Sequence, residues 1–228
     1  MTITIDVISD VICPWCYVGK RRLEKAVALA GRGDVRVRWH PFQLNPTMPK
    51  AGMNRKEYRT AKFGSWSRSL SLDAQVTEAG RDEGIPFAFN KIERTPNTLD
   101  AHRLIWLADQ QGVQDAVVEA LFRAYFTEGQ DITNLSTLLK VASEAGLDRS
   151  RGEALLNGGD GVEAIRAAED DAKRTGVQGV PFCVINGTLA LSGARNPDDF
   201  IAAFNQPTAP VDSEGNVCAI GPGGKSSW

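Results

Sequence analysis

The sequence lacks several features that would direct its interpretation toward common functions. Its 26 basic and 28 acidic residues leave a net charge of −2, which gives no support for nucleic-acid binding or electrostatic membrane attachment. No apolar run approaches the roughly 18 residues of a membrane span, and no Gly-x-Gly-x-x-Gly phosphate loop follows the first apolar stretch. With 228 residues, 42% hydrophobic and 24% charged, the chain reads as one globular domain, or one domain with an insertion.

The start of the sequence also lacks the marks of a secretory signal. Met1 leads directly into the apolar stretch 3–8, without a basic start, an apolar core and a small-residue cleavage site. We therefore expect a cytoplasmic protein. Thiols are mostly kept reduced in that compartment, where a Cys-x-x-Cys is more often catalytic than structural.

Cysteines are few, but two of them are closely spaced. Cys13 and Cys16 lie between the apolar stretch 3–8 and a helical pattern over 20–30, so Cys13 is expected at a helix N-terminus. Unpaired N–H groups and the helix dipole favour negative charge there, lowering a thiol pKa from about 8.5 to roughly 3.5–7.5. Pro14 suits an early helical position. Cys16, one turn further on, can attack a mixed disulfide formed at Cys13.

A Cys-x-x-Cys is also half of a common zinc site, which normally needs a second pair of ligands. The other candidate ligands are widely separated in the sequence: Cys183, Cys218, His40 and His102. They do not form a second pair, so we predict redox chemistry and no metal site.

The rest of the pattern predicts an α/β fold with an all-helical insertion. A half-buried strand over 35–42 completes a right-handed βαβ unit, helical periodicity then fills about 55–175, and Asn186-Gly187 joins two apolar runs as a hairpin. Asn196-Pro197 opens a last helix. The expected parts are residues 1–48 with 176–205, a helical insertion over 49–175 whose last helix returns to the first part, and a tail over 206–228.

The second half of the site is expected at Val180 and Pro181, which enter the hairpin. An X–Pro bond tolerates the cis form, and a cis bond would turn the Val180 backbone outward to pair with an extended peptide. An ordinary trans proline at a strand start is the alternative that the residues leave open. The insertion begins and ends near the strand ends that carry Cys13 and Pro181, so we expect it to cover one edge of the site.

Several motifs occur in a specific order along residues 3–204. They are Asp10 to Lys20, Pro41-Phe42-Gln43-Leu44-Asn45-Pro46, Thr95-Pro96-Asn97-Thr98 with Ala101-His102, Ala120-Leu121-Phe122 with Ala124-Tyr125-Phe126, and Gly176-Val177-Gln178-Gly179-Val180-Pro181-Phe182. In this the chain resembles the DsbA-like branch of the thioredoxin superfamily, and most of all its signal-less FrnE-type members. The resemblance implies a thioredoxin fold, Cys13 as nucleophile, Cys16 as resolving thiol and a cis Pro181.

The chain departs from that family at two cysteines. Some FrnE-type proteins carry a second cysteine pair in the C-terminal tail, whereas this tail has Cys218 alone, so a second redox centre there is doubtful. The family tends to have an aromatic residue where Cys183 stands, and we expect Cys183 to be an inert buried thiol.

Supporting roles are expected for several other residues. Asp10 either caps the active-site turn, which is the favoured reading, or accepts a proton from Cys16. Trp15 forms an apolar docking surface or covers the core, and Asn97 lines the cleft. The remaining expectations are structural: His40 and His102 as structural histidines, and Lys20, Arg21 and Arg22 as a solvated helix face.

These observations predict a thiol–disulfide oxidoreductase or isomerase acting on protein disulfides, with no cofactor beyond its redox-active disulfide. Glutathione or a thioredoxin-like reductant is a possible redox partner, and the protein is a monomer or a homodimer. The rival enzyme class is a glutathione-dependent isomerase or transferase of the 2-hydroxychromene-2-carboxylate isomerase or kappa-class type, which typically has serine at the active site. A redox-sensing or chaperone-like binding module is the third possibility.

Overall fold

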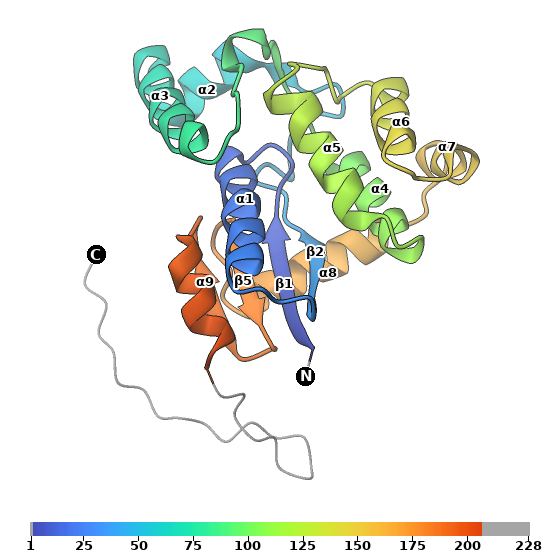
Figure 1. Ribbon diagram of the computed structural model, residues 1–228. Helices are drawn as coiled ribbons and strands as arrows, with labels where there is room; N and C mark the ends of the chain where they lie inside the picture. Colours follow the sequence, from blue (N-terminus) through green and yellow to red (C-terminus); the bar gives the residue numbers. More distant parts are fainter. Residues whose placement is uncertain (1, 207–228) are drawn as a thin grey trace.

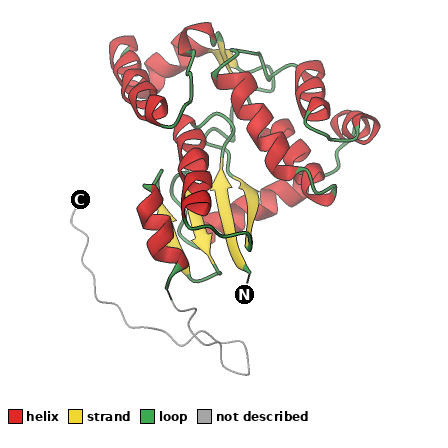
Figure 2. Ribbon diagram, in the orientation of Figure 1, coloured by secondary structure: helices red, strands yellow, loops and turns green. Residues whose placement is uncertain are grey.

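The protein is built on a four-stranded mixed sheet (Figures 1 and 2). The computed structural model describes residues 2–206. The strand order is β2-β1-β5-β6: β1 and β2 are parallel, and β5 pairs antiparallel with both β1 and β6. The strands are β1 (Ile3–Ser9), β2 (Val35–Pro41), β5 (Phe182–Ile185) and β6 (Leu189–Ser192).

Helices cover both faces of this sheet, because side chains along β1 alternate between them. Ile5 and Val7 belong to the main core, which also contains Phe200 of α9 (Pro197–Phe204) and side chains of α1 (Pro14–Leu29). Ile8 instead packs in a second cluster with Ala172 of α8 (Val162–Arg174). The thioredoxin fold predicted from the sequence, βαβ followed by ββα with a helical insertion between, is confirmed.

The Asn-Gly signal forms the predicted hairpin between β5 and β6. Asn186 and Gly187 have φ angles of 50° and 70°, the left-handed conformation that a two-residue turn of this kind requires. The Asn186 carboxamide oxygen also accepts a hydrogen bond from the Thr4 N–H at 3.0 Å. The turn is thereby tied to the start of β1.

The insertion is helical, as predicted, apart from a small element that the sequence pattern did not indicate. Two-residue strands β3 (Met53–Asn54) and β4 (Arg94–Thr95) pair antiparallel. The helices are α2 (Arg55–Phe63), α3 (Trp66–Asp82), the short 3-10 helix η1 (Phe89–Lys91), α4 (Leu99–Gln110), α5 (Gln114–Phe126), α6 (Leu135–Glu144) and α7 (Arg149–Asn157), followed by α8. Within residues 2–206, none of the helices combines the length and apolarity needed to cross a membrane.

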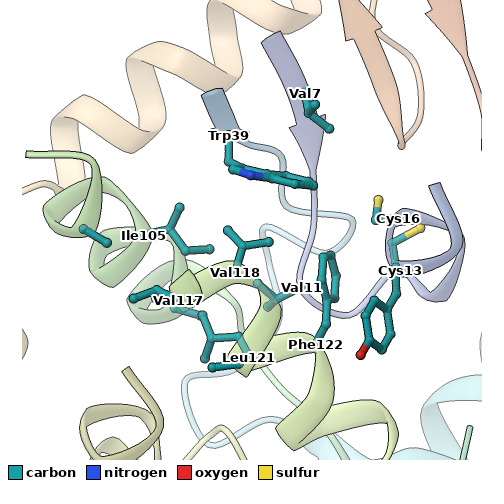
Figure 3. Close-up of a cluster of buried hydrophobic side chains, with 14 of the residues drawn as sticks. Val7, Val11, Cys13, Cys16, Trp39, Ile105, Val117, Val118, Leu121 and Phe122 are labelled. Carbon is teal, nitrogen blue, oxygen red and sulfur yellow. The ribbon is translucent and has the colours of Figure 1, made fainter. Parts of the chain in front are cut away.

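A shared core joins the insertion to the sheet (Figure 3). Trp39 of β2, 4% exposed, lies between the strands and helices α4 and α5. It meets Phe122 of α5 edge to face, with ring centroids 6.4 Å apart. Aromatic pairs of this geometry add about 0.5–1.5 kcal/mol to the stabilisation from burial. The insertion is therefore packed against the sheet rather than tethered to it.

The N-terminus of α5 makes polar contacts that fix its position on β2. The Gln114 carboxamide accepts a hydrogen bond from the Trp39 N–H and donates one to the Trp39 carbonyl, both at 2.9 Å. The neighbouring Asp115 accepts a hydrogen bond from the Trp39 indole N–H at 2.9 Å. Gln114 thus pairs with the Trp39 N–H and carbonyl, the two backbone groups that a further strand would bind.

The structure corrects the expectation of a solvated face at Lys20, Arg21 and Arg22. The Lys20 side chain is 2% exposed, and its ammonium group lies 3.0 Å from Asp115 and 3.6 Å from Glu119, with Glu24 also in contact. Burial alone would lower the pKa of Lys20, but the charges of Asp115 and Glu24 outweigh burial and raise it. Lys20 therefore links α1 to α5 as a buried cation.

Removing Lys20 should destabilise the protein. We expect Lys20→Ala to lower the free energy of unfolding by about 2–3 kcal/mol, because it removes a buried side chain and leaves Asp115 without its cation. The measurement is urea denaturation at neutral pH. Lys140→Ala is the matched control, since the Lys140 side chain is 63% exposed, and it should cost less than about 0.5 kcal/mol. Equal effects of the two substitutions would contradict the assignment.

Candidate active site

The active-site turn places Cys13 at the N-cap of α1. Cys13 has an extended backbone and Pro14 is the first helical residue, while the Cys13 N–H donates to the Asp10 carbonyl at 3.0 Å. No acidic residue lies in the first turn of α1 itself. This position favours negative charge on the Cys13 sulfur.

The two thiols of the motif have different surroundings. Cys13 is 5% exposed and lines a cavity, whereas Cys16 is 1% exposed and does not. Burial raises the pKa of Cys16 well above its ordinary value, and the hydrogen bond and charge of Cys13 add to this rise. A hydrogen bond from the Asp10 backbone partly offsets it. Cys16 is therefore held as a protonated thiol, shielded from the cavity.

Val180 and Pro181 lie against the same turn. The Val180–Pro181 bond is cis, and the Cys13 thiol donates a hydrogen bond to the Val180 carbonyl at 3.4 Å. Pro181 packs on Gly19 of α1, where an added Cβ would come within 3.2 Å of the proline ring. The absence of a side chain at Gly19 lets Pro181 approach the helix that carries the cysteines.

Asp10 is fully buried beneath the turn. One carboxylate oxygen accepts a hydrogen bond from the Ile12 N–H at 3.4 Å, and the other accepts one from the Leu44 N–H at 2.8 Å. Asp10 thus caps the turn, as favoured from the sequence, although helix α1 itself has no side-chain cap. It also fixes the segment after β2 beside the cysteines.

A second carboxylate, which the sequence did not single out, holds the same segment. Glu169 of α8 is 4% exposed and accepts hydrogen bonds from the Gln43 N–H at 2.7 Å and from the Gln43 carboxamide at 3.1 Å. The motif that contains Gln43 and Leu44 was recognised in the sequence. Its carboxylate partner is 126 residues away, so no local signal could have identified it.

A cavity of about 270 Å³ lies beside Cys13, and residues of the helical insertion form much of its lining. Trp15, 38% exposed, stands at its rim, in agreement with the predicted apolar surface beside the thiol. The active-site turn and the segment after β2 contribute Ile12, Cys13, Pro14, Trp15, Leu44 and Asn45. The insertion contributes Arg55, Tyr58, Arg59, Lys62, Phe63, Leu72, Asp73, Val76, Phe89, Ile92, Thr95, Tyr125 and Phe126.

The cavity wall formed by α2 and α3 is basic. Arg55 and Arg59 both contact Asp73 at 2.7 Å, and Lys62 donates to the Tyr58 hydroxyl at 2.8 Å. Three cations therefore face one carboxylate. These cations were not predicted from the sequence, although Arg55, Arg59 and Lys62 recur at positions i, i+4 and i+7, the spacing of one helix face.

The structure places Asn97 away from the cavity, so the expectation that it lines the cleft is wrong. Its carboxamide donates to the Met48 carbonyl at 2.7 Å and accepts a hydrogen bond from the Leu99 N–H at 3.0 Å. Asn97 therefore joins the start of α4 to the loop after β2. Both the nitrogen and the oxygen of the Asn97 carboxamide are therefore hydrogen-bonded to backbone groups.

Cys183 is a buried thiol, as predicted. It is 4% exposed in the main core, opposite Val7 of β1, and burial raises its pKa to about 12. Cys218 and the tail, apart from Gln206, lie outside the described residues. Within residues 2–206, no group of three or more His, Cys, Asp or Glu side chains is placed to hold a metal ion.

The fold and the site define a class: a thioredoxin-fold protein with a helical insertion and a Cys-x-x-Cys turn at the start of its first helix. The DSBA-like thioredoxin domain matches residues 4–205. The chain belongs to this family, whose members are thiol oxidoreductases.

Comparison with individual proteins agrees with this membership. The chain is 29% identical over 206 residues to YwbO, an uncharacterised protein of Bacillus subtilis, covering 90% of this chain and 97% of that one. A structure described as a probable DsbA oxidoreductase of Streptomyces coelicolor has a TM-score of 0.83 and 30% identity, covering 92% and 94%. The cytosolic disulfide reductase DsbM of Pseudomonas aeruginosa with GSH shares the fold, with a TM-score of 0.62 and 21% identity, covering 88% and 96%.

Burial of Cys183 should make stability fall in alkali. Its folded-state pKa of about 12 lies above the ordinary value of 9.0, so the native state keeps a proton that the unfolded chain releases. The free energy of unfolding should then fall above about pH 9, by roughly 1.4 kcal/mol per pH unit from this group. Between pH 8 and pH 10.5, Cys183→Ala should lose about 2 kcal/mol less than the wild type in urea denaturation. Equal losses would show that Cys183 does not titrate in this way.

Proposed function

We propose that the protein is a cytoplasmic thiol–disulfide oxidoreductase or isomerase that acts on protein disulfides. The observation that carries this proposal is the contrast between the two thiols. Cys13 lies at a helix N-terminus and borders a cavity, and Cys16 lies one turn away, buried and protonated. This asymmetry suits one thiol to attack a substrate and the other to release it.

In the reductive direction, the Cys13 thiolate attacks one sulfur of a substrate disulfide. A Cys13–substrate disulfide forms and the other substrate sulfur leaves as a thiolate. Cys16 then loses its proton and attacks the Cys13 sulfur, which releases the second substrate thiolate and leaves a Cys13–Cys16 disulfide. The substrate gains two electrons and the protein loses two. The same steps in reverse oxidise a substrate dithiol. Isomerisation results when another thiolate of the substrate, instead of Cys16, attacks the mixed disulfide and releases Cys13.

Pro14, Trp15, Val180 and Pro181 are the proposed substrate-binding residues. Trp15 offers an exposed apolar surface at the cavity rim, and the Val180 carbonyl lies within hydrogen-bond distance of the Cys13 sulfur. An extended peptide whose cysteine reached Cys13 would pass these groups. Backbone pairing with such a peptide gives affinity with little dependence on sequence.

The division of roles can be tested by trapping the intermediate. Cys13→Ser should abolish insulin reduction. Cys16→Ser should accumulate a mixed disulfide between Cys13 and the substrate, because the resolving thiol is gone. Mass spectrometry after acid quenching measures both outcomes. Cys183→Ser is the matched control and should retain activity; trapping at Cys16 in a Cys13→Ser variant would reverse the assigned roles.

Glutathione is the proposed low-molecular-weight redox partner. It is a thiol with two carboxylates, and the cavity beside Cys13 presents Arg55, Arg59 and Lys62 against the single carboxylate of Asp73. Both arginines contact Asp73. Among residues 2–206, the Lys62 ammonium group instead contacts the Tyr58 hydroxyl and the Asn45 carboxamide oxygen, which are neutral. Lys62 is therefore the cation best placed to meet an incoming anion. DsbM, which shares the fold, is a disulfide reductase whose structure holds GSH.

Charge at Lys62 should matter for an anionic reductant and not for a neutral one. We expect Lys62→Ala to lower kcat/KM with glutathione roughly two- to fivefold, the effect of one partly exposed ionic contact. The rate with dithiothreitol should stay unchanged. Lys56→Ala removes an exposed charge from the same helix outside the cavity and serves as control. An equal loss with both reductants, or none with glutathione, would contradict glutathione binding at this wall.

The rival reading, a glutathione-dependent isomerase or transferase, is less well supported because the chain retains both cysteines where that class typically has serine. A binding module without turnover would leave Cys16 without a role. We also propose membership of the FrnE-type subgroup, a monomeric or homodimeric state, and no cofactor apart from the redox-active disulfide.

A further inference from the structure

The strand β2 lies at one side of the sheet, and among residues 2–206 no strand pairs with its outer edge (Figure 1). Successive residues of a strand direct their N–H and C=O groups to opposite sides. The Asp34 carbonyl accepts a hydrogen bond from the Ile3 N–H at 2.9 Å, so Asp34 and every second residue after it face β1. The backbone groups of Val35, Val37 and Trp39 therefore face the outer edge.

Of these three residues, only Trp39 has its outward backbone groups occupied. Gln114 binds both the N–H and the carbonyl of Trp39. Within residues 2–206, Val35 and Val37 make no backbone hydrogen bond to a turn, loop or helix. Two N–H groups and two carbonyls are thus left open, which is the pairing capacity of a short added strand.

A groove of about 490 Å³ lies beside this open edge, between β2 and α1. Val35 and Val37, both half-buried, line it together with Leu23 and Val27 of α1. An added strand would direct alternate side chains into this apolar space. The charged residues that line the groove already form ion pairs: Lys20, Glu24, Arg32 and Asp115.

The opposite face of the same edge is basic. Arg36 and Arg38 alternate with the valines, and both are exposed. The nearby carboxylates of Asp6 and Asp34 are paired with Arg38 and Arg32. Arg36 is therefore the cation that a strand added at this edge would meet.

The inner edge of β2 shows which residues complement this pattern. β1 presents Ile5-Asp6-Val7 to Val37-Arg38-Trp39. The Asp6 carboxylate binds Arg38 through two hydrogen bonds of 2.8 and 2.9 Å, while Ile5 and Val7 enter the main core. An acidic residue between two apolar residues thus matches an arginine between two apolar residues. Val35-Arg36-Val37 offers the same arginine pattern to the outer edge.

We propose that the outer edge of β2 over residues 35–37 is a docking site for an extended segment of another protein, in which an acidic residue stands between two apolar residues. In an antiparallel arrangement, the apolar residues pair with Val35 and Val37 through backbone hydrogen bonds. The acidic residue then lies opposite Arg36 in a non-hydrogen-bonded pair, where side chains are closest. Strand addition of this kind is a general mode of peptide recognition.

This docking site is separate from the exchange site. The groove beside β2 shares no lining residue with the cavity at Cys13. Leu23 lies ten residues beyond Cys13 along α1, which corresponds to roughly 15 Å of helix. A protein docked at this edge therefore leaves Cys13 open, and the inference does not depend on the proposed function.

A second copy of this chain fits the edge less well. Two-fold antiparallel pairing of β2 with β2 through Val35 and Val37 would place Arg36 opposite Arg36 of the second copy. Like charges directly opposite each other destabilise a strand pair. The edge therefore favours an acidic segment over itself.

The test uses the full-length protein and two fluorescein-labelled peptides, Thr-Val-Asp-Val-Thr and Thr-Val-Lys-Val-Thr. We expect the aspartate peptide to bind roughly fivefold more tightly than the lysine peptide in anisotropy titrations. Hydrogen exchange followed by NMR locates the contact. The aspartate peptide should protect the Val35 and Val37 amides and leave the Arg36 amide unchanged, because that amide already pairs with β1.

Two substitutions separate backbone pairing from charge. Val37→Pro removes an outward N–H, a change that an edge strand tolerates, and should weaken binding of the aspartate peptide roughly tenfold. Val37→Ala keeps the N–H and is the matched control, with a loss of about threefold or less. Arg36→Glu should reverse the preference between the two peptides. Because Arg36 is exposed, this variant decides the question if Val37→Pro does not fold.

Several results would overturn the docking site. They are the absence of binding by either peptide at millimolar concentration, equal affinities of the two peptides for the wild type, and protection confined to the cavity at Cys13. A dimer in analytical ultracentrifugation that Val37→Pro abolishes would show that a second copy occupies the edge, and would also overturn the proposal. Insulin reduction by Arg36→Glu should equal that of the wild type; a loss would show that the edge is not separate from the exchange site.

Discussion

The attachment of α5 to both α1 and β2 is the contact on which the site depends. Asp115 accepts a hydrogen bond from the Trp39 indole and forms an ion pair with the buried Lys20. One carboxylate therefore joins the active-site helix, the edge strand and the insertion. This joint fixes the insertion relative to Cys13. The cavity wall formed by α2 and α3 can then lie opposite the thiol at a defined distance rather than move independently of it.

Buried charge is arranged differently on the two sides of the active-site turn. On the cavity side, cations from α2 face the thiol that would be negative during exchange. On the inner side, Asp10 and Glu169 are both used to bind backbone N–H groups of the turn and of the segment after β2. Burying a carboxylate is costly unless it is hydrogen-bonded, and these contacts account for how two acids are tolerated beneath one loop.

Local sequence signals predicted much of this structure, and contacts distant in sequence account for what they missed. The positions of Cys13 and Pro14 and the Asn186-Gly187 turn follow from residues within a few positions of each other. Lys20 was misread because its partner Asp115 is 95 residues away, so the run of basic residues looked like solvated surface. The two-residue strands β3 and β4 are too short to leave a periodic pattern. The cavity cations were missed although their helical spacing was readable.

The pairing of Gln114 with the Trp39 backbone has a further consequence for the edge of the sheet. In the described part of the chain, β2 has one strand neighbour, β1. A strand edge without a partner strand is a template on which another chain can add and aggregate. A side-chain carboxamide that fills both backbone positions at Trp39 interrupts that template, and the exposed Arg36 and Arg38 place charges along the rest of the strand. The helix that anchors the insertion thus also discourages edge-to-edge self-association of the sheet.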